Sequence, residues 1–134
     1  MPTVIRRTTA FTTTDRRRDV RGSLGWGVTS RTWSPPTDLY ETEAAYVISV
    51  EIGGMREADF DVTFEGGTLV INGIRPDLPE RRAYHQMEIH FGKFSTAVAL
   101  PGPVDLDHSQ AEYKNGFLVV RLPKPKATDV KIEE

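Results

Sequence analysis

The stretch AEYKNGFLVVRLP, residues 111–123, decides the fold. Asn115 and Gly116 stand in its middle, between two segments with the composition of strands. Both residue types tolerate the positive φ of a type I′ turn, the tight connection between antiparallel strands. Pro123 ends the second segment, since proline cannot donate to a strand ladder. The stretch therefore predicts a β-hairpin.

Alternating apolar and polar residues recur upstream of this hairpin, which places large side chains on one face of each predicted strand. Further strands are expected at residues 45–52, 60–65, 69–71 and 94–100. Turns are expected at Gly66-Gly67 and at Asn72-Gly73, where the residue types again tolerate positive φ.

About seven short strands fit into fewer than about 100 residues, and no helix longer than one turn is predicted. This count favours an all-β, immunoglobulin-like antiparallel β-sandwich. We place it at residues 34–124, because Pro35 and Pro36 interrupt any regular element before it. Residues 125–134 then form a short C-terminal extension.

Residues 1–33 read as a mobile, basic N-terminal arm without helical or strand periodicity. The arm holds seven arginines against two aspartates, whereas the rest of the chain holds ten basic and seventeen acidic residues. A basic arm on an acidic body can contact nucleic acid, a membrane surface, or the bodies of neighbouring subunits. The sequence leaves these alternatives open.

Composition excludes several functions. The chain has no cysteine, so disulfides, thiol nucleophiles and cysteine-ligated metals are ruled out. No apolar run is long enough to span a bilayer and no secretion signal is visible, so we expect a cytoplasmic protein. No cofactor motif is present, and the three histidines lack metal-ligand spacing, so we expect no enzyme and no small-molecule substrate.

A polar, proline-containing excursion follows the middle strands at residues 74–79, and a second strand-like segment follows it at residues 84–89. A strand carried on a long loop can reach the free sheet edge of a second molecule. The alternative is a hairpin formed within one subunit.

Together these motifs resemble the α-crystallin domain of the small heat shock proteins. NGFLVVRLPK, residues 115–124, resembles the family's N-G-x-L-x-V-x-L-P-K signature, and GKF at residues 92–94 with LP at residues 100–101 resembles a second motif. PPTDLYE and GGMREADF, residues 35–41 and 53–60, resemble the opening strand and the L-P-G-x-x-x-x-D-I segment.

The resemblance implies an ATP-independent holdase that keeps partly unfolded clients from aggregating and assembles from dimers into a homo-oligomer. It implies a tail anchor at Val130 and Ile132, a V-x-I form of the family's I-x-I motif, for which the alternative is a frayed terminus. It implies a receiving groove between residues 60–65 and 109–114, for which the alternative is ordinary core. The implied lining is Val62, Phe64, Ala111 and Tyr113, and the implied dimer strand exchange is Tyr84, His85, Gln86, Met87, Glu88 and Ile89.

Two rival functions remain. The arginine-rich arm suggests a nucleic-acid or membrane-surface adaptor, although the arm lacks the interleaved aromatic residues typical of RNA readers. A p23-like co-chaperone would share a related sandwich, but the V-x-I tail and the L-P-K end argue against it.

Overall fold

The computed structural model describes residues 5–7 and 32–126, and this part of the chain is all-β, as predicted. Two 3-10 helices, η1 (Glu57–Asp59) and η2 (Leu106–His108), precede β4 and β7. The strands are β1 (Ile5–Arg7), β2 (Thr37–Glu41), β3 (Ala45–Glu51), β4 (Phe60–Glu65), β5 (Thr68–Arg75), β6 (Gly92–Ala99), β7 (Gln110–Lys114) and β8 (Phe117–Pro123).

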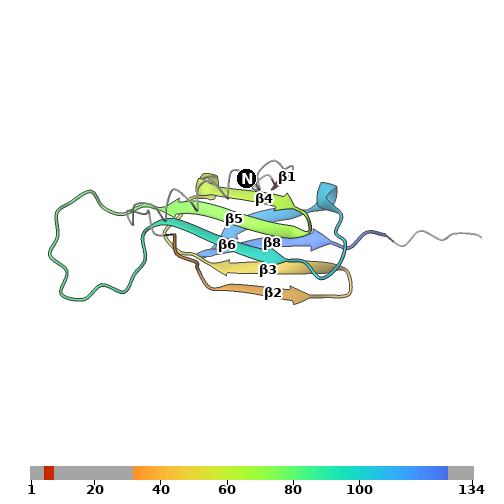
Figure 1. Ribbon diagram of the computed structural model, residues 1–134, viewed down its shortest axis with the longest axis horizontal. Coiled ribbons are helices and arrows are strands. Elements are labelled where there is room, and N and C mark those ends of the chain that lie inside the picture. The colour runs from red at the N-terminus through yellow and green to blue at the C-terminus, as the bar shows by residue number, and fades with distance from the viewer. Residues whose placement is uncertain (1–4, 8–31, 127–134) are drawn as a thin grey trace, which may run out of the picture.

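The strands form two four-stranded sheets that lie face to face (Figure 1). One sheet has the order β1-β4-β5-β6 and the other has the order β2-β3-β8-β7. Every pair is antiparallel except β1 with β4, which is parallel. The predicted antiparallel β-sandwich is thus confirmed, with one short parallel strand added at its edge.

The core lies between the sheets and is built from the alternation seen in the sequence. In β8, for example, Leu118, Val120 and Leu122 are fully buried while Phe117 and Val119 point outward. Burying each such side chain stabilises the fold by roughly 1.5–3 kcal/mol. The other large side chains with almost no exposed area are Ile48, Val50, Ile52, Val62, Leu69, Ile71 and Phe94.

Two tight turns confirm the glycine motifs read from the sequence. Asn115 and Gly116 have φ angles of 54° and 82° and connect β7 to β8. Gly66 and Gly67 have φ angles of 55° and 80° and connect β4 to β5. Both connections have the two positive φ angles of a type I′ turn, whose twist matches that of the flanking strands.

The turn predicted at Asn72-Gly73 is wrong, because β5 runs straight through both residues. Gly73 is instead required by packing. A Cβ atom at this position would lie 2.5 Å from Cζ of Phe94, in the centre of the core. The Asn-Gly pattern favours a turn, but it cannot distinguish freedom in φ from the need for an empty position beside an aromatic ring.

The domain boundaries stay a prediction; in the described residues β2 begins at Thr37, directly after the two prolines. The sequence did not predict β1, a three-residue strand within the expected arm. Trp33, also assigned to the arm, packs against the core and forms a bridge to Phe94. Most of the arm, and the tail anchor Val130 and Ile132, lie outside the described residues.

Candidate interaction surfaces

The predicted groove residues lie where the edges of the two sheets meet, on β4 and β7. Val62 and Ala111 are fully buried and belong to the central core. Phe64 and Tyr113 are half-buried and pack against that core from its rim. Only Phe64 and Tyr113 therefore offer apolar surface to another segment, while Val62 and Ala111 lie beneath them.

Tyr113 is held in place by contacts of its hydroxyl group and of its aromatic ring. Its hydroxyl donates to the carbonyl of Ile52 at 2.8 Å and lies 3.3 Å from the backbone N–H of Met55, which donates to it. Its ring lies 5.1 Å from that of Phe60, a contact that joins β7 to β4 across the two sheets. The rim of this side of the sandwich is therefore preorganised.

The outer edge of β4 carries the backbone of β1, which sequence patterns did not reveal. Ile5 pairs with Val62, Arg6 with Thr63 and Arg7 with Phe64. A strand of three residues with two arginines gives no alternating pattern, so no sequence signal could have located it. The edge expected to receive a tail segment is thus already paired within this chain.

Residues 76–91 form a long loop that projects beyond the sandwich at the end of β5 (Figure 1). Residues 84–89 pair with no strand of the described chain, so the hairpin alternative is not formed there. Their side chains are exposed throughout, including His85, Gln86 and Glu88. Large apolar side chains are among them: Tyr84 is 46% exposed, Met87 62% and Ile89 64%.

The base of this loop is closed by Arg75, the last residue of β5. Its guanidinium donates from Nε to the carbonyl oxygen of His90 at 2.8 Å, and from Nη2 to the same oxygen. It also lies 4.5 Å from the ring centroid of Trp33, and the His90 ring stacks on Trp33 at 5.1 Å. Both ends of the loop and the point where the arm joins the sandwich therefore meet in one cluster.

One ion pair stiffens the loop itself. Arg82 contacts Oδ1 of Asp77 at 2.5 Å, and the backbone N–H of Leu78 donates to the same oxygen at 2.8 Å. The hydrogen bond from Arg82 is the main cause that holds the pKa of Asp77 below its usual value. Because both side chains are partly exposed, the pair orders the loop locally and adds little to global stability.

The acidic and histidine side chains of residues 32–126 form no candidate metal site. No group of three or more potential metal ligands is found there. His108 pairs with Asp105 at 2.7 Å on the surface, and Glu88 accepts a hydrogen bond from Gln86 rather than from His90. The helices of this part of the chain are single 3-10 turns, which cannot cross a bilayer.

The described residues thus form a β-sandwich domain with a preorganised rim and a projecting loop that exposes apolar side chains. Comparison with known proteins identifies the family of this domain. The model of the Hsp20/alpha crystallin family matches residues 38–133, which is most of the chain. The chain belongs to this family, the small heat shock proteins.

Curated proteins with similar sequences support the family assignment. Small heat shock protein C4 of Rickettsia felis is 33% identical over 100 residues, covering 73% of this chain and 61% of that protein. Spore protein SP21 of Stigmatella aurantiaca is 36% identical over 92 residues, covering 67% of this chain and 54% of that protein. The match thus spans somewhat more than half the length of these relatives.

Solved structures of small heat shock proteins support the assignment of the fold. A small heat-shock protein from Xylella fastidiosa superposes with a TM-score of 0.68 at 27% identity, covering 78% of this chain and 97% of that chain. HspA from Xanthomonas axonopodis gives a TM-score of 0.66 at 29% identity, covering 73% of this chain and all of that chain. The predicted α-crystallin sandwich is confirmed, whereas the cytoplasmic location and the absence of enzymatic activity stay predictions.

Proposed function

We propose that this protein is an ATP-independent holdase that binds partly unfolded proteins and works as an oligomer built from dimers. The proposal rests on apolar side chains that lie outside the core and are exposed on the surface. Leu78, Met87 and Ile89 are each more than 60% exposed on one loop. Exposed apolar surface of this kind is expected where a protein binds other proteins.

Dimerisation by strand exchange is the use we propose for residues 84–89. In the described chain the terminal strands are β1 and β6 of one sheet and β2 and β7 of the other. β1 has only three residues and β6 is bridged by Trp33, which leaves β2 and β7 as the longer open edges. We assign β2 as the acceptor, because β7 borders the groove proposed for the tail. Residues 84–89 of one subunit would then add a strand to the sheet of the other, with backbone hydrogen bonds supplying affinity.

Tail docking is the second contact we propose. Val130 and Ile132 are two residues apart, so in an extended segment both side chains point to the same side and enter one groove. The rim residues Phe64 and Tyr113 supply apolar surface for them. Because an edge strand accepts one partner at a time, the tail of a neighbour has to displace β1 from β4. Such a weak, replaceable contact suits an assembly that exchanges subunits.

Client proteins would use the same surfaces. An unfolding protein displays apolar segments and strand edges, which can replace either a tail or an exchanged strand. Binding by exposed surface requires no nucleotide hydrolysis, and the sequence holds no phosphate-binding G-x-x-x-x-G-K-[ST] loop. No cofactor is needed for this mechanism.

The decisive experiment combines light scattering with an aggregation assay on a heat-labile client, at physiological salt and without ATP. We expect an assembly larger than a dimer and suppression of client precipitation. A protein that stays monomeric at all concentrations and leaves the client insoluble would refute the proposal. If it instead bound RNA or anionic vesicles at low salt and lost them at moderate salt, the arm would define an adaptor.

Two variants separate the proposed contacts. Met87→Ser with Ile89→Ser should raise the dimer dissociation constant at least about tenfold, since two apolar side chains lose their burial. Val130→Ala with Ile132→Ala should leave dimers intact and reduce the larger assembly. Val119→Ser, on the outer face of β8, is the matched control for exposed apolar surface in general.

A further inference from the structure

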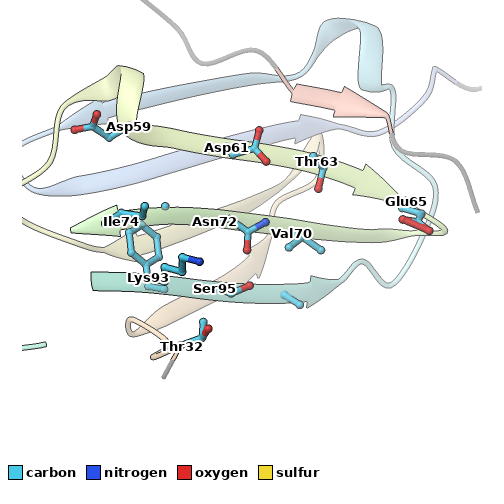
Figure 2. A pocket seen from close by; sticks show the side chains of 13 residues that line it. Thr32, Asp59, Asp61, Thr63, Glu65, Val70, Asn72, Ile74, Lys93 and Ser95 are labelled. Atoms are coloured by element: carbon cyan, nitrogen blue, oxygen red, sulfur yellow. The ribbon is translucent and has the colours of Figure 1, made fainter. Parts of the chain in front are cut away.

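The outer face of β4, β5 and β6 is hollowed into a shallow groove of about 830 Å³ (Figure 2). Most of its lining comes from the outward positions of these three strands, so the groove lies on the side of the sheet opposite the core. Figure 2 shows Asp61 and Thr63 on β4, Asn72 and Val70 on β5, and Ser95 on β6. Ile74, which is 56% exposed, and Ala97 add apolar surface.

Acidic residues outnumber basic ones in this lining. The acidic residues are Asp59, at the end of η1, and Asp61 and Glu65 on β4, whereas Lys93 on β6 is the single basic residue of the lining. Asp59 forms an ion pair with Arg56, whose Nε lies 3.3 Å from its Oδ2. The groove therefore combines an acidic wall with a partly apolar floor, and it fits a segment that carries both arginines and apolar side chains.

Two described pieces of the same chain lie at opposite corners of this face. β1 lies along the outer edge of β4 and ends with Arg7 beside Phe64. Thr32 lines the groove at the other side, and Trp33 pairs with β6 through hydrogen bonds with Lys93 and Ser95 of 3.1 and 2.9 Å. Residues 8–31 thus leave one corner of the face and return at the corner diagonally opposite.

The span between these corners is about 20–25 Å, estimated from the spacing of strands and of residues along them. Roughly seven extended residues cover that distance, so residues 8–31 are long enough to cross the groove with length to spare. The other route would lead around the second sheet. The direct route passes over the acidic wall, and residues 8–31 contain five arginines against two aspartates.

We propose that this groove binds residues 8–31 of the same chain, with their arginines against the carboxylates of β4 and their apolar side chains over Val70, Ile74 and Ala97. The inference goes beyond the chaperone function and does not depend on it. It assigns the basic arm an acidic partner within its own subunit, in place of a nucleic acid.

The absence of native cysteine makes disulfide trapping a clean test. Thr14→Cys is paired with Asn72→Cys in the groove of the full-length protein. The matched control pairs Thr14→Cys with Glu112→Cys, which lies exposed on β7 in the other sheet. We expect the first pair to form an intrachain disulfide several times faster than the second, detected by mass spectrometry. Equal rates would overturn the proposal.

Charge reversal then tests the cause of the contact. Asp61→Lys and Glu65→Lys should each slow trapping of the first pair about two- to fivefold, as expected for partly exposed ion pairs. Glu112→Lys should leave it unchanged, and circular dichroism checks that each variant folds. Unaltered trapping in both reversal variants would overturn the electrostatic part of the inference. A disulfide between chains would instead assign the groove to the arm of a second copy.

Discussion

β8 and residues 84–89 both read as strands in the sequence, yet only β8 is a strand in the structure. β8 lies between β3 and β7, so its backbone is paired on both sides and its inward side chains are fully buried. Residues 84–89 have no neighbouring strand, and their apolar side chains stay exposed. Alternation thus describes the preference of a segment, while an available sheet edge decides whether the strand forms within the same chain.

The largest difference in the free energy of unfolding is expected between substitutions at two neighbouring positions of β8. Leu118→Ala leaves a cavity in the centre of the core and should lower the free energy of unfolding by about 2–5 kcal/mol. Val119→Ala, one residue later on the outer face, should change it by less than about 1 kcal/mol. Urea unfolding of both variants measures the difference, and equal losses would mean that the two faces of β8 are not distinct.

A smaller loss of stability is expected when a single methyl group is added to the core. Gly73→Ala places a Cβ against the ring of Phe94, and overpacking of this kind costs about 1–3 kcal/mol. Gly53→Ala is the matched control, because no atom lies within 4 Å of the position of its Cβ. If both variants unfolded at the same urea concentration, the close approach of Phe94 to β5 would be refuted.

These positions show what the sequence could predict. Hydrophobic alternation and the two glycine turns were enough to predict the sandwich, because each pattern reflects a structural preference of residues that are close together in the sequence. Gly73 was misread, since its reason lies on β6, far away in sequence. The groove stays a prediction: of its four expected lining residues, Phe64 and Tyr113 lie at the rim of the sandwich, whereas Val62 and Ala111 are core. Burial depends on the neighbouring sheet, which periodicity does not reveal.

Arg75 is a second residue whose role could not be read from the sequence. Its contacts join the end of β5, the carbonyl of His90 and the ring of Trp33, which are dispersed along the chain. In the sequence Arg75 belongs to the polar, proline-containing segment 74–79, where it resembles any other surface charge. Only the fold brings together the base of the loop and the end of the arm.

Replacing this arginine should loosen the loop without unfolding the sandwich. Arg75→Lys keeps the charge but loses the planar guanidinium, which reaches one carbonyl oxygen with two nitrogens. We therefore expect the free energy of local opening at the base of the loop to fall by about 1 kcal/mol. Hydrogen exchange should accelerate in residues 90–93 and remain slow in β8. Arg81→Lys, on the exposed part of the loop, serves as the control. Unchanged exchange at the base of the loop would show that Arg75 does not close it.

The smallest effect concerns the pair of Asp77 and Arg82, which acts only within the loop. Since the pKa of Asp77 in the folded chain lies below the ordinary value of 3.8, the pair is complete above that value. Its ordering effect is lost as the pH falls through the lowered pKa, when the carboxylate becomes protonated. The amide signal of Leu78, which donates to Asp77, should report this titration by NMR.

Arg82→Gln should move the midpoint of that titration upward, toward 3.8, because the hydrogen bond from the guanidinium is the main cause of the low pKa. Arg81→Gln removes the same charge one residue away and should leave the midpoint in place. A midpoint that moved equally in both variants would indicate the general charge of the loop rather than this contact. The loop's local order and the sandwich's global stability are therefore separable, since this titration should leave the core strands undisturbed.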